Sequence, residues 1–259
     1  MAEEQVVIDD NTGALEIIKG TNQYLQTYDF NLAVARGRIT GVTNVNIFGY
    51  QAAVGTNQYA VWENVAAYVP PATAQLMHVT GTGSDSASIL VQGLDASYNP
   101  ISETVILNGS TPVTTINQYF RIQGISVTAG SVTNPASTVT LTNIANTVTY
   151  AKINANVGKS QMAIYTVPAG NTFYLSRIDS VTSLNGNTAA FTNYRNQNTF
   201  STGVVQYVAQ AVFTQNYRIQ RVVPLPIPAG TDIQFQLGTS TGTATVSIFV
   251  EGFLVPNNI

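Results

Sequence analysis

Residues 227–237 read Ile-Pro-Ala-Gly-Thr-Asp-Ile-Gln-Phe-Gln-Leu, a turn of proline and glycine followed by alternating apolar and polar side chains. Ile233, Phe235 and Leu237 fall on one face of the strand predicted after the turn, and they alternate with Asp232, Gln234 and Gln236. A strand of this kind has one face against a core and the other in solvent. The stretch therefore predicts an antiparallel β-sandwich.

The same signals recur along the chain. Residues 167–175 (Val-Pro-Ala-Gly-Asn-Thr-Phe-Tyr-Leu) repeat the turn that feeds a strand, and residues 244–250 repeat the alternation. Asn108-Gly109 is a strong hairpin signal, because both residues adopt positive φ easily. Strands about ten residues apart, joined by Gly, Pro and Asn turns, are typical of sandwiches and jelly rolls.

Composition favours the same fold class. Thr (33 residues) and Asn (24) outnumber all charged residues together, and only 9% of the chain is charged, against roughly a quarter in an ordinary soluble protein. β-Branched Thr suits a pleated surface and Asn suits turns. We therefore expect an all-β chain of two consecutive antiparallel β-sandwich or jelly-roll-like units preceded by an extended N-terminal arm. The predicted ranges are an arm with short strands at 1–65, a first sandwich at 66–155 and a second, jelly-roll-like sandwich at 156–259.

Charge and cysteine usage limit the function classes. The net charge is −3, there is no cysteine, and no Lys or Arg occurs between Arg38 and Arg121. Nucleic-acid binding requires basic residues that neutralise phosphates, so we expect no nucleic-acid partner. No apolar run approaches the roughly 18 residues of a membrane span, and the acidic start does not resemble a secretory signal. We expect neither a membrane partner nor a thiolate metal site.

No arrangement of residues indicates catalysis. His78 is the only histidine, so it has no second histidine for a metal site, and no Gly-x-Ser-x-Gly elbow accompanies it. The carboxylates that a glycosidase would need are scattered one per strand or turn: Asp85, Asp95, Glu103, Asp179, Asp232 and Glu251. Weak calcium binding at Asp85 and Asp95 is an alternative to simple Asx-turns. We expect no enzyme activity, no catalytic residues, no metal ligands and no cofactor.

Aromatic and arginine residues supply the interface candidates, since both types are enriched in protein interfaces. They form three groups: the arm, the cluster at 193–198 and the cluster at 215–218. The candidates are Tyr24, Tyr28, Phe30, Arg36, Arg38, Tyr194, Arg195, Tyr217 and Arg218. A glycan site is an alternative use of the two C-terminal clusters. A sheet-rich chain with few charges also has little defence against edge-to-edge pairing, so we expect a homo-oligomer, most simply a trimer.

Several stretches resemble a family of small virion structural proteins of tailed phages, especially those infecting cyanobacteria and marine bacteria. They cover roughly residues 35–175 in order: 35–37, 47–49, 53–55, 61–63 (Val-Trp-Glu), 68–70, 91–95 (Val-Gln-Gly-Leu-Asp), 98–99, 102–105, 107–109 and 164–170 (Ile-Tyr-Thr-Val-Pro-Ala-Gly). These are turn-and-strand motifs, so no functional residue transfers with them. The resemblance implies a capsid-associated or tail-associated protein, assembled in the host cytoplasm and located in the virion.

The leading interpretation is a capsid decoration, or cement, protein that braces the major capsid protein or other virion proteins. A neck, tail or baseplate component is the first alternative, and a glycan- or receptor-binding module on the particle surface is the second. The arm is expected to be the main anchor to the particle. An equally weighted reading is that the arm folds over its own sandwich, with Phe48 and Trp62 in the core.

Overall fold

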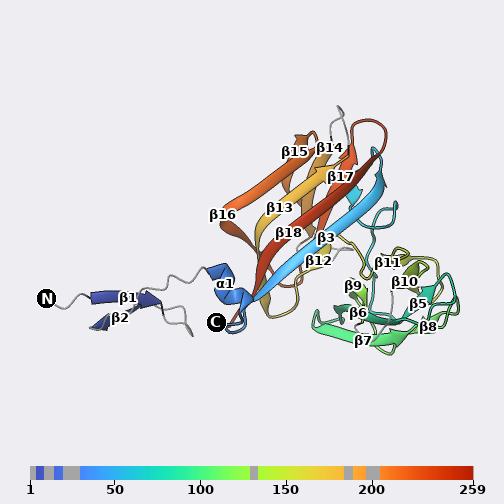
Figure 1. Ribbon diagram of the computed structural model, residues 1–259, viewed down its shortest axis with the longest axis horizontal. Coiled ribbons are helices and arrows are strands. Elements are labelled where there is room, and N and C mark those ends of the chain that lie inside the picture. Colours follow the sequence, from blue (N-terminus) through green and yellow to red (C-terminus); the bar gives the residue numbers. More distant parts are fainter. Residues whose placement is uncertain are drawn as a thin grey trace.

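A computed structural model describes residues 4–8, 15–19, 30–128, 134–183, 189–196 and 205–258, with side chains for 30–128, 134–183 and 210–258. Two β-sandwiches lie side by side, and a two-stranded hairpin lies apart from them (Figure 1). The hairpin pairs β1 (Glu4–Ile8) with β2 (Leu15–Lys19). The prediction of an all-β chain of antiparallel sandwiches is confirmed, and the described helix is the short α1 (Phe30–Ala35). No helix among the described residues is long and apolar enough to cross a membrane.

The larger sandwich is a jelly roll of two sheets. One sheet has the order β16-β13-β18-β3, and the other has the order β12-β17-β14-β15, with the short β4 (Tyr59–Ala60) added on β17. Numbered along the chain from one to eight, these strands give the orders 6-3-8-1 and 2-7-4-5, the pattern of a rolled antiparallel ribbon. The eight strands are β3 (Thr43–Val54), β12 (Ile164–Thr166), β13 (Asn171–Thr182), β14 (Ala189–Asn196), β15 (Val205–Phe213), β16 (Asn216–Pro228), β17 (Asp232–Thr239) and β18 (Ala244–Pro256).

The two Pro-Ala-Gly turns form one corner of the jelly roll. The first turn joins β12 to β13 and the second joins β16 to β17, so each one carries the chain from one sheet to the other. Gly170 and Gly230 both have φ of +71°, a conformation that glycine adopts without steric cost. The amide of Gly230 donates to the carbonyl of Val167 at 2.9 Å. The resemblance between the two segments therefore reflects two adjacent turns.

The smaller sandwich is inserted between the first and second strands of the jelly roll, β3 and β12. Its sheets have the orders β11-β10-β5-β8 and β7-β6-β9. Their strands are β5 (Met77–Gly81), β6 (Ser88–Leu94), β7 (Pro100–Ile106), β8 (Val113–Thr114), β9 (Arg121–Val127), β10 (Val139–Asn143) and β11 (Thr149–Ile153). All seven strands lie within the predicted range 66–155.

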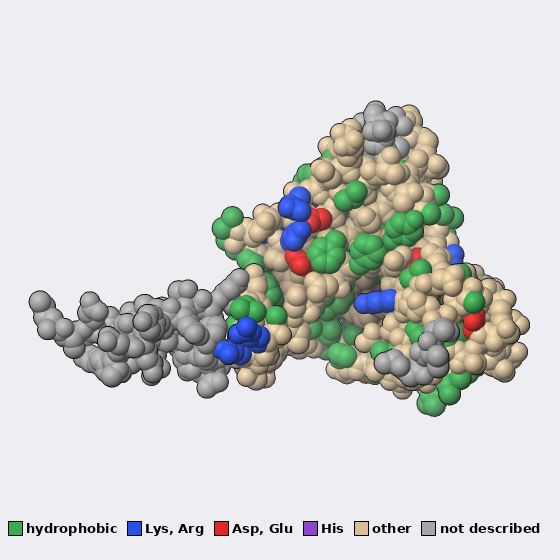
Figure 2. Space-filling model, in the orientation of Figure 1, with side chains coloured by type: hydrophobic (Ala, Val, Ile, Leu, Met, Phe, Trp, Pro, Cys, Tyr) green, Lys and Arg blue, Asp and Glu red, His purple; other side chains and the backbone are tan. Residues whose placement is uncertain are grey.

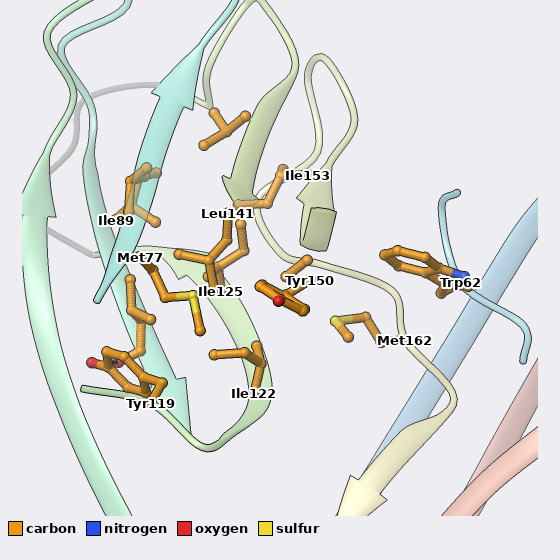
Figure 3. Close-up of a cluster of buried hydrophobic side chains, with 14 of the residues drawn as sticks. Trp62, Met77, Ile89, Tyr119, Ile122, Ile125, Leu141, Tyr150, Ile153 and Met162 are labelled. Atoms are coloured by element: carbon orange, nitrogen blue, oxygen red, sulfur yellow. Dashed lines mark hydrogen bonds between the residues drawn. The ribbon is translucent and has the colours of Figure 1, made fainter. Parts of the chain in front are cut away.

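Each sandwich has its own hydrophobic core. The core of the inserted sandwich contains Met77, Ile89, Tyr119 and Leu141, and it continues through Met162 to Trp62 at the side that faces the jelly roll (Figure 3). The indole Nε1 of Trp62 donates to the carbonyl of Ala66 at 3.0 Å, which satisfies its polar atom inside the protein. Trp62 is 1% exposed, so its predicted place in a core is confirmed. Phe48 is 43% exposed, and its predicted place in the core is wrong.

A buried ion pair joins the two sandwiches. Arg121 on β9 donates from Nε and Nη2 to the two carboxylate oxygens of Asp232 on β17, at 2.8 and 3.0 Å. Arg121 also donates to the carbonyls of Pro71 and Phe120, and Thr166 donates to Asp232 at 2.6 Å. The guanidinium carbon lies 3.9 Å from the centre of the Phe120 ring. Five polar contacts therefore satisfy this pair inside the protein.

A second buried carboxylate lies where the chain passes between the sandwiches. Glu63 is 8% exposed, and its Oε1 accepts from the amide of Gln161 on the returning segment. Its Oε2 has no hydrogen-bond partner among the residues with described side chains. Burial raises the pKa of Glu63 to about 8, although the Gln161 hydrogen bond and the charge of Lys152 oppose the rise. A neutral Glu63 therefore fits this position near pH 7.

The structure corrects two sequence predictions. Residues 43–60 do not belong to an arm, because β3 pairs with β18 and β4 pairs with β17 inside the jelly roll. The smaller sandwich is therefore inserted into the larger one, and the two do not follow each other along the chain. The pairing of β3 with β18 joins strands roughly 190 residues apart, and no local sequence pattern marks it. The polar face of β17 is also not solvated: Asp232 and Gln234 are 3% and 1% exposed. The inserted sandwich covers that face, as the bond from Gln234 to the carbonyl of Tyr68 shows.

Candidate protein-interaction surface

The outer face of the sheet β16-β13-β18-β3 carries a groove of about 730 Å³ beside α1. Alternation places Phe173, Leu175 and Val250 in the core, so their neighbours along the strands form the outer face. Phe253 on β18 packs edge-on against Phe30 of α1, with ring centroids 5.0 Å apart. The short helix therefore forms one wall of the groove, and aromatic rings line it at that side.

An ion-pair network lies in the sheet face next to the groove. Arg177 binds Asp179 and Glu251, and Arg218 binds Asp179 with Nε–Oδ1 at 2.8 Å. Partial burial alone would raise the pKa of Asp179, but hydrogen bonds from both arginines outweigh it and lower that pKa. Figure 2 shows basic and acidic side chains close together on this side of the molecule, with hydrophobic side chains beside them. This surface thus combines apolar, acidic and basic groups, as protein interfaces do.

A bulge in the edge strand β16 forms the opposite wall of the groove. β13 pairs Leu175 with Leu225 and then Arg177 with Gln220, so residues 221–224 have no partner on β13. Val222 and Val223 in this bulge are 100% and 78% exposed. Arg221, also in the bulge, lines the groove, and its Nε is buried without a hydrogen-bond partner in the described chain. The bulge therefore presents apolar side chains and an arginine whose Nε has no acceptor.

The predicted interface residues are partly brought together. Phe30 lines the groove, and Arg218 joins the network on the same sheet face. Arg36 and Arg38 follow α1 and are exposed. Tyr217 is different, because it stacks on Phe213 at 5.5 Å and packs against the jelly-roll core.

The remaining candidates lie outside this description. Tyr24 and Tyr28 fall outside the described residues. Tyr194 and Arg195 lie on β14, a central strand paired with both β15 and β17, but only their backbone is described. The sequence interpretation missed Arg177, Glu251, Phe253 and the Val222 bulge. Alternation along residues 244–256 offered a signal for Glu251 and Phe253, whereas nothing local marked the bulge.

The polar residues considered for chemistry have structural partners. His78 contacts Asn146 through Nδ1 at 3.0 Å. Asp95 accepts from the amides of Ser97 and Asn99, the geometry of an Asx-turn. Asp85 accepts from the amides of Ala136 and Ser137 and so connects two loops. Among residues 30–128, 134–183 and 210–258, no three His, Asp or Glu side chains come together as a metal site.

Comparison of the chain with protein-family models, with curated proteins and with solved structures finds no match.

Proposed function

We propose that this chain is a structural protein of a tailed-phage particle, where it acts as a capsid decoration protein that braces the shell. Its partners are the major capsid protein or other virion proteins. The resemblance of residues 35–175 to virion proteins of tailed phages suggests this location. The jelly roll is compatible with it, because double-sheet jelly rolls occur in viral capsid proteins as well as in lectins.

The observation that carries the proposal is the exposure of large apolar side chains on both sandwiches. Val222 and Val223 protrude from the jelly roll, and Ile106 and Ile116 on the inserted sandwich are 64% and 90% exposed. Single exposed apolar residues are ordinary on a protein surface. Here each of the two sandwiches exposes two large apolar side chains, so each sandwich offers a place where a neighbouring protein could bind. The buried Arg121–Asp232 pair joins the two bodies, and in the proposed role this junction would carry load from one surface to the other.

A glycan-binding role has less support. In one of the two aromatic clusters that suggested it, Tyr217 is partly buried and stacks on Phe213 beside the core. A carbohydrate site needs an accessible aromatic face for stacking. The polar and charged groove instead favours a protein partner.

Copy number in purified particles tests the proposal. Quantitative mass spectrometry, with the major capsid protein as reference, is expected to find hundreds of copies per virion. Shells that lack the protein are expected to bind the purified chain and to gain resistance to heating. A handful or a few dozen copies would assign the chain to the neck, tail or baseplate. Its absence from particles would exclude a virion role.

A further inference from the structure

One face of the N-terminal hairpin carries four aliphatic residues and, at the end away from the turn, the pair Glu4 and Lys19. The register pairs Val6 with Ile17 and Ile8 with Leu15, so these four residues share a face, because directly opposite residues and alternate residues lie on the same side. The other face carries Gln5, Val7, Glu16 and Ile18. β1 and β2 join no other sheet of the described chain. An isolated two-stranded hairpin is marginally stable in water, so this one needs a surface to cover its apolar face.

Because residues 43–60 belong to the jelly roll, the arm is taken from here on as residues 1–29. The arm and the rest of the chain carry opposite net charges. Residues 1–29 contain six carboxylates and one lysine, a formal charge of −5. Residues 30–259 contain nine Lys or Arg and seven carboxylates, a formal charge of +2. Two acidic residues, Asp9 and Asp10, fall between the paired strands. The arm is therefore attracted to a basic surface of another copy, and the attraction weakens as salt is added.

The groove on the outer face of the jelly roll complements the hairpin. Phe30, Phe253 and Val222 offer apolar contacts along it. Arg177 and Arg221 bring positive charge, and Glu251 offsets one of these two charges. Arg177 is already paired with two carboxylates, whereas the Nε of Arg221 has no acceptor among the described residues. An apolar segment that carries a carboxylate would place its negative charge beside the guanidinium of Arg221 and would cover Val222.

We propose that the β1–β2 hairpin of one copy docks in the groove of a second copy. In Figure 1 the hairpin lies beyond α1 and apart from its own sandwiches. Every copy carries one hairpin and one groove, so the contacts close either between two copies that exchange hairpins or around a ring of copies. The inference concerns self-association and does not depend on where the protein acts. It also gives the arm a role different from an anchor to the shell.

Engineered disulfides test this contact cleanly, because the chain contains no cysteine. One batch of the full-length chain carries Ile17→Cys and a first tag, and another carries Val222→Cys and a second tag. The batches are mixed and oxidised with glutathione. We expect a disulfide between the two tags, seen on a non-reducing gel and lost on reduction. Leu15→Cys, on the same hairpin face, is a second variant in case Ile17→Cys disturbs the fold.

Matched controls use neighbouring positions that the proposed contact does not include. Ile18→Cys places the thiol on the other face of the hairpin, and Thr241→Cys places it in the exposed turn between β17 and β18. Neither control is expected to crosslink above one-tenth of the level of the test pair. Equal crosslinking of tests and controls would mean random collision and would overturn the proposal.

The remaining outcomes also decide the question. A single chain carrying both Ile17→Cys and Val222→Cys that forms only an internal disulfide would show docking on its own groove and would refute exchange between copies. Failure of both hairpin variants to crosslink, with circular dichroism unchanged, would refute docking altogether. Light scattering is expected to show an oligomer for the native chain and at least a tenfold weaker association for Arg221→Glu.

Discussion

Two ion-pair clusters in this protein use the same residue types under different conditions. At the junction between the sandwiches, the side chains of Arg121 and Asp232 are 3% and 4% exposed. On the outer sheet, the side chain of Arg218 is 65% exposed and that of its partner Asp179 is 17% exposed. Burial removes the competing water, so loss of one partner at the junction leaves a charge that nothing solvates. On the sheet, water replaces a lost partner at little cost.

Glu63 extends the comparison within the junction itself. It is buried like Asp232, but no guanidinium binds it, and burial raises its pKa to about 8. The junction therefore holds one carboxylate that is paired with a guanidinium and one that lacks such a partner, and burial raises the pKa of the second. The difference teaches that burial alone does not set the charge state of a group. A charged partner on the neighbouring sandwich also affects the charge state of a buried group.

The largest expected effect is loss of the junction arginine. Arg121→Ala leaves Asp232 buried without its counter-charge, so we expect the free energy of unfolding to fall by about 3–5 kcal/mol. Urea denaturation followed by Trp62 fluorescence measures the loss. The double variant Arg121→Met/Asp232→Leu removes both charges and is expected to recover most of the stability. A single variant within 1 kcal/mol of the native chain would contradict the assignment of this pair as the main junction contact.

The next effect depends on pH and concerns Glu63→Gln. In the unfolded chain Glu63 ionises near its ordinary pKa of 4.5, whereas in the folded protein it stays protonated up to about pH 8. The native chain therefore has its full stability from this group below pH 4.5, loses it as pH rises to 8, and then levels off. We expect Glu63→Gln to match the native chain at pH 4 and to exceed it by about 4 kcal/mol at pH 9.

Thermal unfolding of both proteins between pH 4 and pH 9 checks this prediction. Glu103→Gln is the control, since Glu103 is a partly exposed carboxylate that caps a loop by accepting from the amides of Ile116 and Asn117. A gain at pH 9 in this control as well would assign the effect to the loss of any negative charge rather than to the burial of Glu63. Parallel curves for the native chain and Glu63→Gln across the whole range would mean that Glu63 ionises normally in the folded protein.

A smaller effect is expected on the sheet face. Asp179→Asn removes the carboxylate that holds Arg177 and Arg218, and we expect a loss below about 1 kcal/mol that shrinks further in 0.5 M salt. Urea denaturation at low and high salt measures both parts. If Asp179→Asn lowers the free energy of unfolding as much as Arg121→Ala does, the network on the sheet is shielded from water. The two ion-pair clusters would then not differ in their effect on stability.

The smallest effect on stability is expected at the bulge. Val222 is fully exposed, so Val222→Ser should leave the free energy of unfolding within about 0.5 kcal/mol of the native value. The same variant is expected to weaken self-association, measured by analytical ultracentrifugation at several concentrations. Val65→Ser, at a 63% exposed position away from the groove, is the matched control. If Val222→Ser and Val65→Ser associate equally well, the bulge is not part of the self-association interface.

Local pattern was sufficient for the strands and for the Pro-Ala-Gly turns. Alternation at residues 232–239 and 244–250 marks strands because the side-chain period of a strand acts within the segment itself. The turns at Gly170 and Gly230 follow from the φ that glycine permits. The same reasoning assigned residues 43–60 to an arm, since β3 finds its hydrogen-bond partner on β18, far away in the chain. Pairing at that distance leaves no trace in a single sequence.

The sequence by itself determined the all-β class, the absence of cysteine and the acidic character of the arm. Those properties depend on residue types and on their spacing over a few positions. Only the tertiary structure decided that the first sandwich is inserted into the jelly roll and that Asp232 is buried against Arg121. It also decided that Phe30 and Arg177 line one groove, although they lie far apart in the chain. Burial, charge pairing and shape depend on which distant strands pack together, and that depends on the free energy of the whole fold.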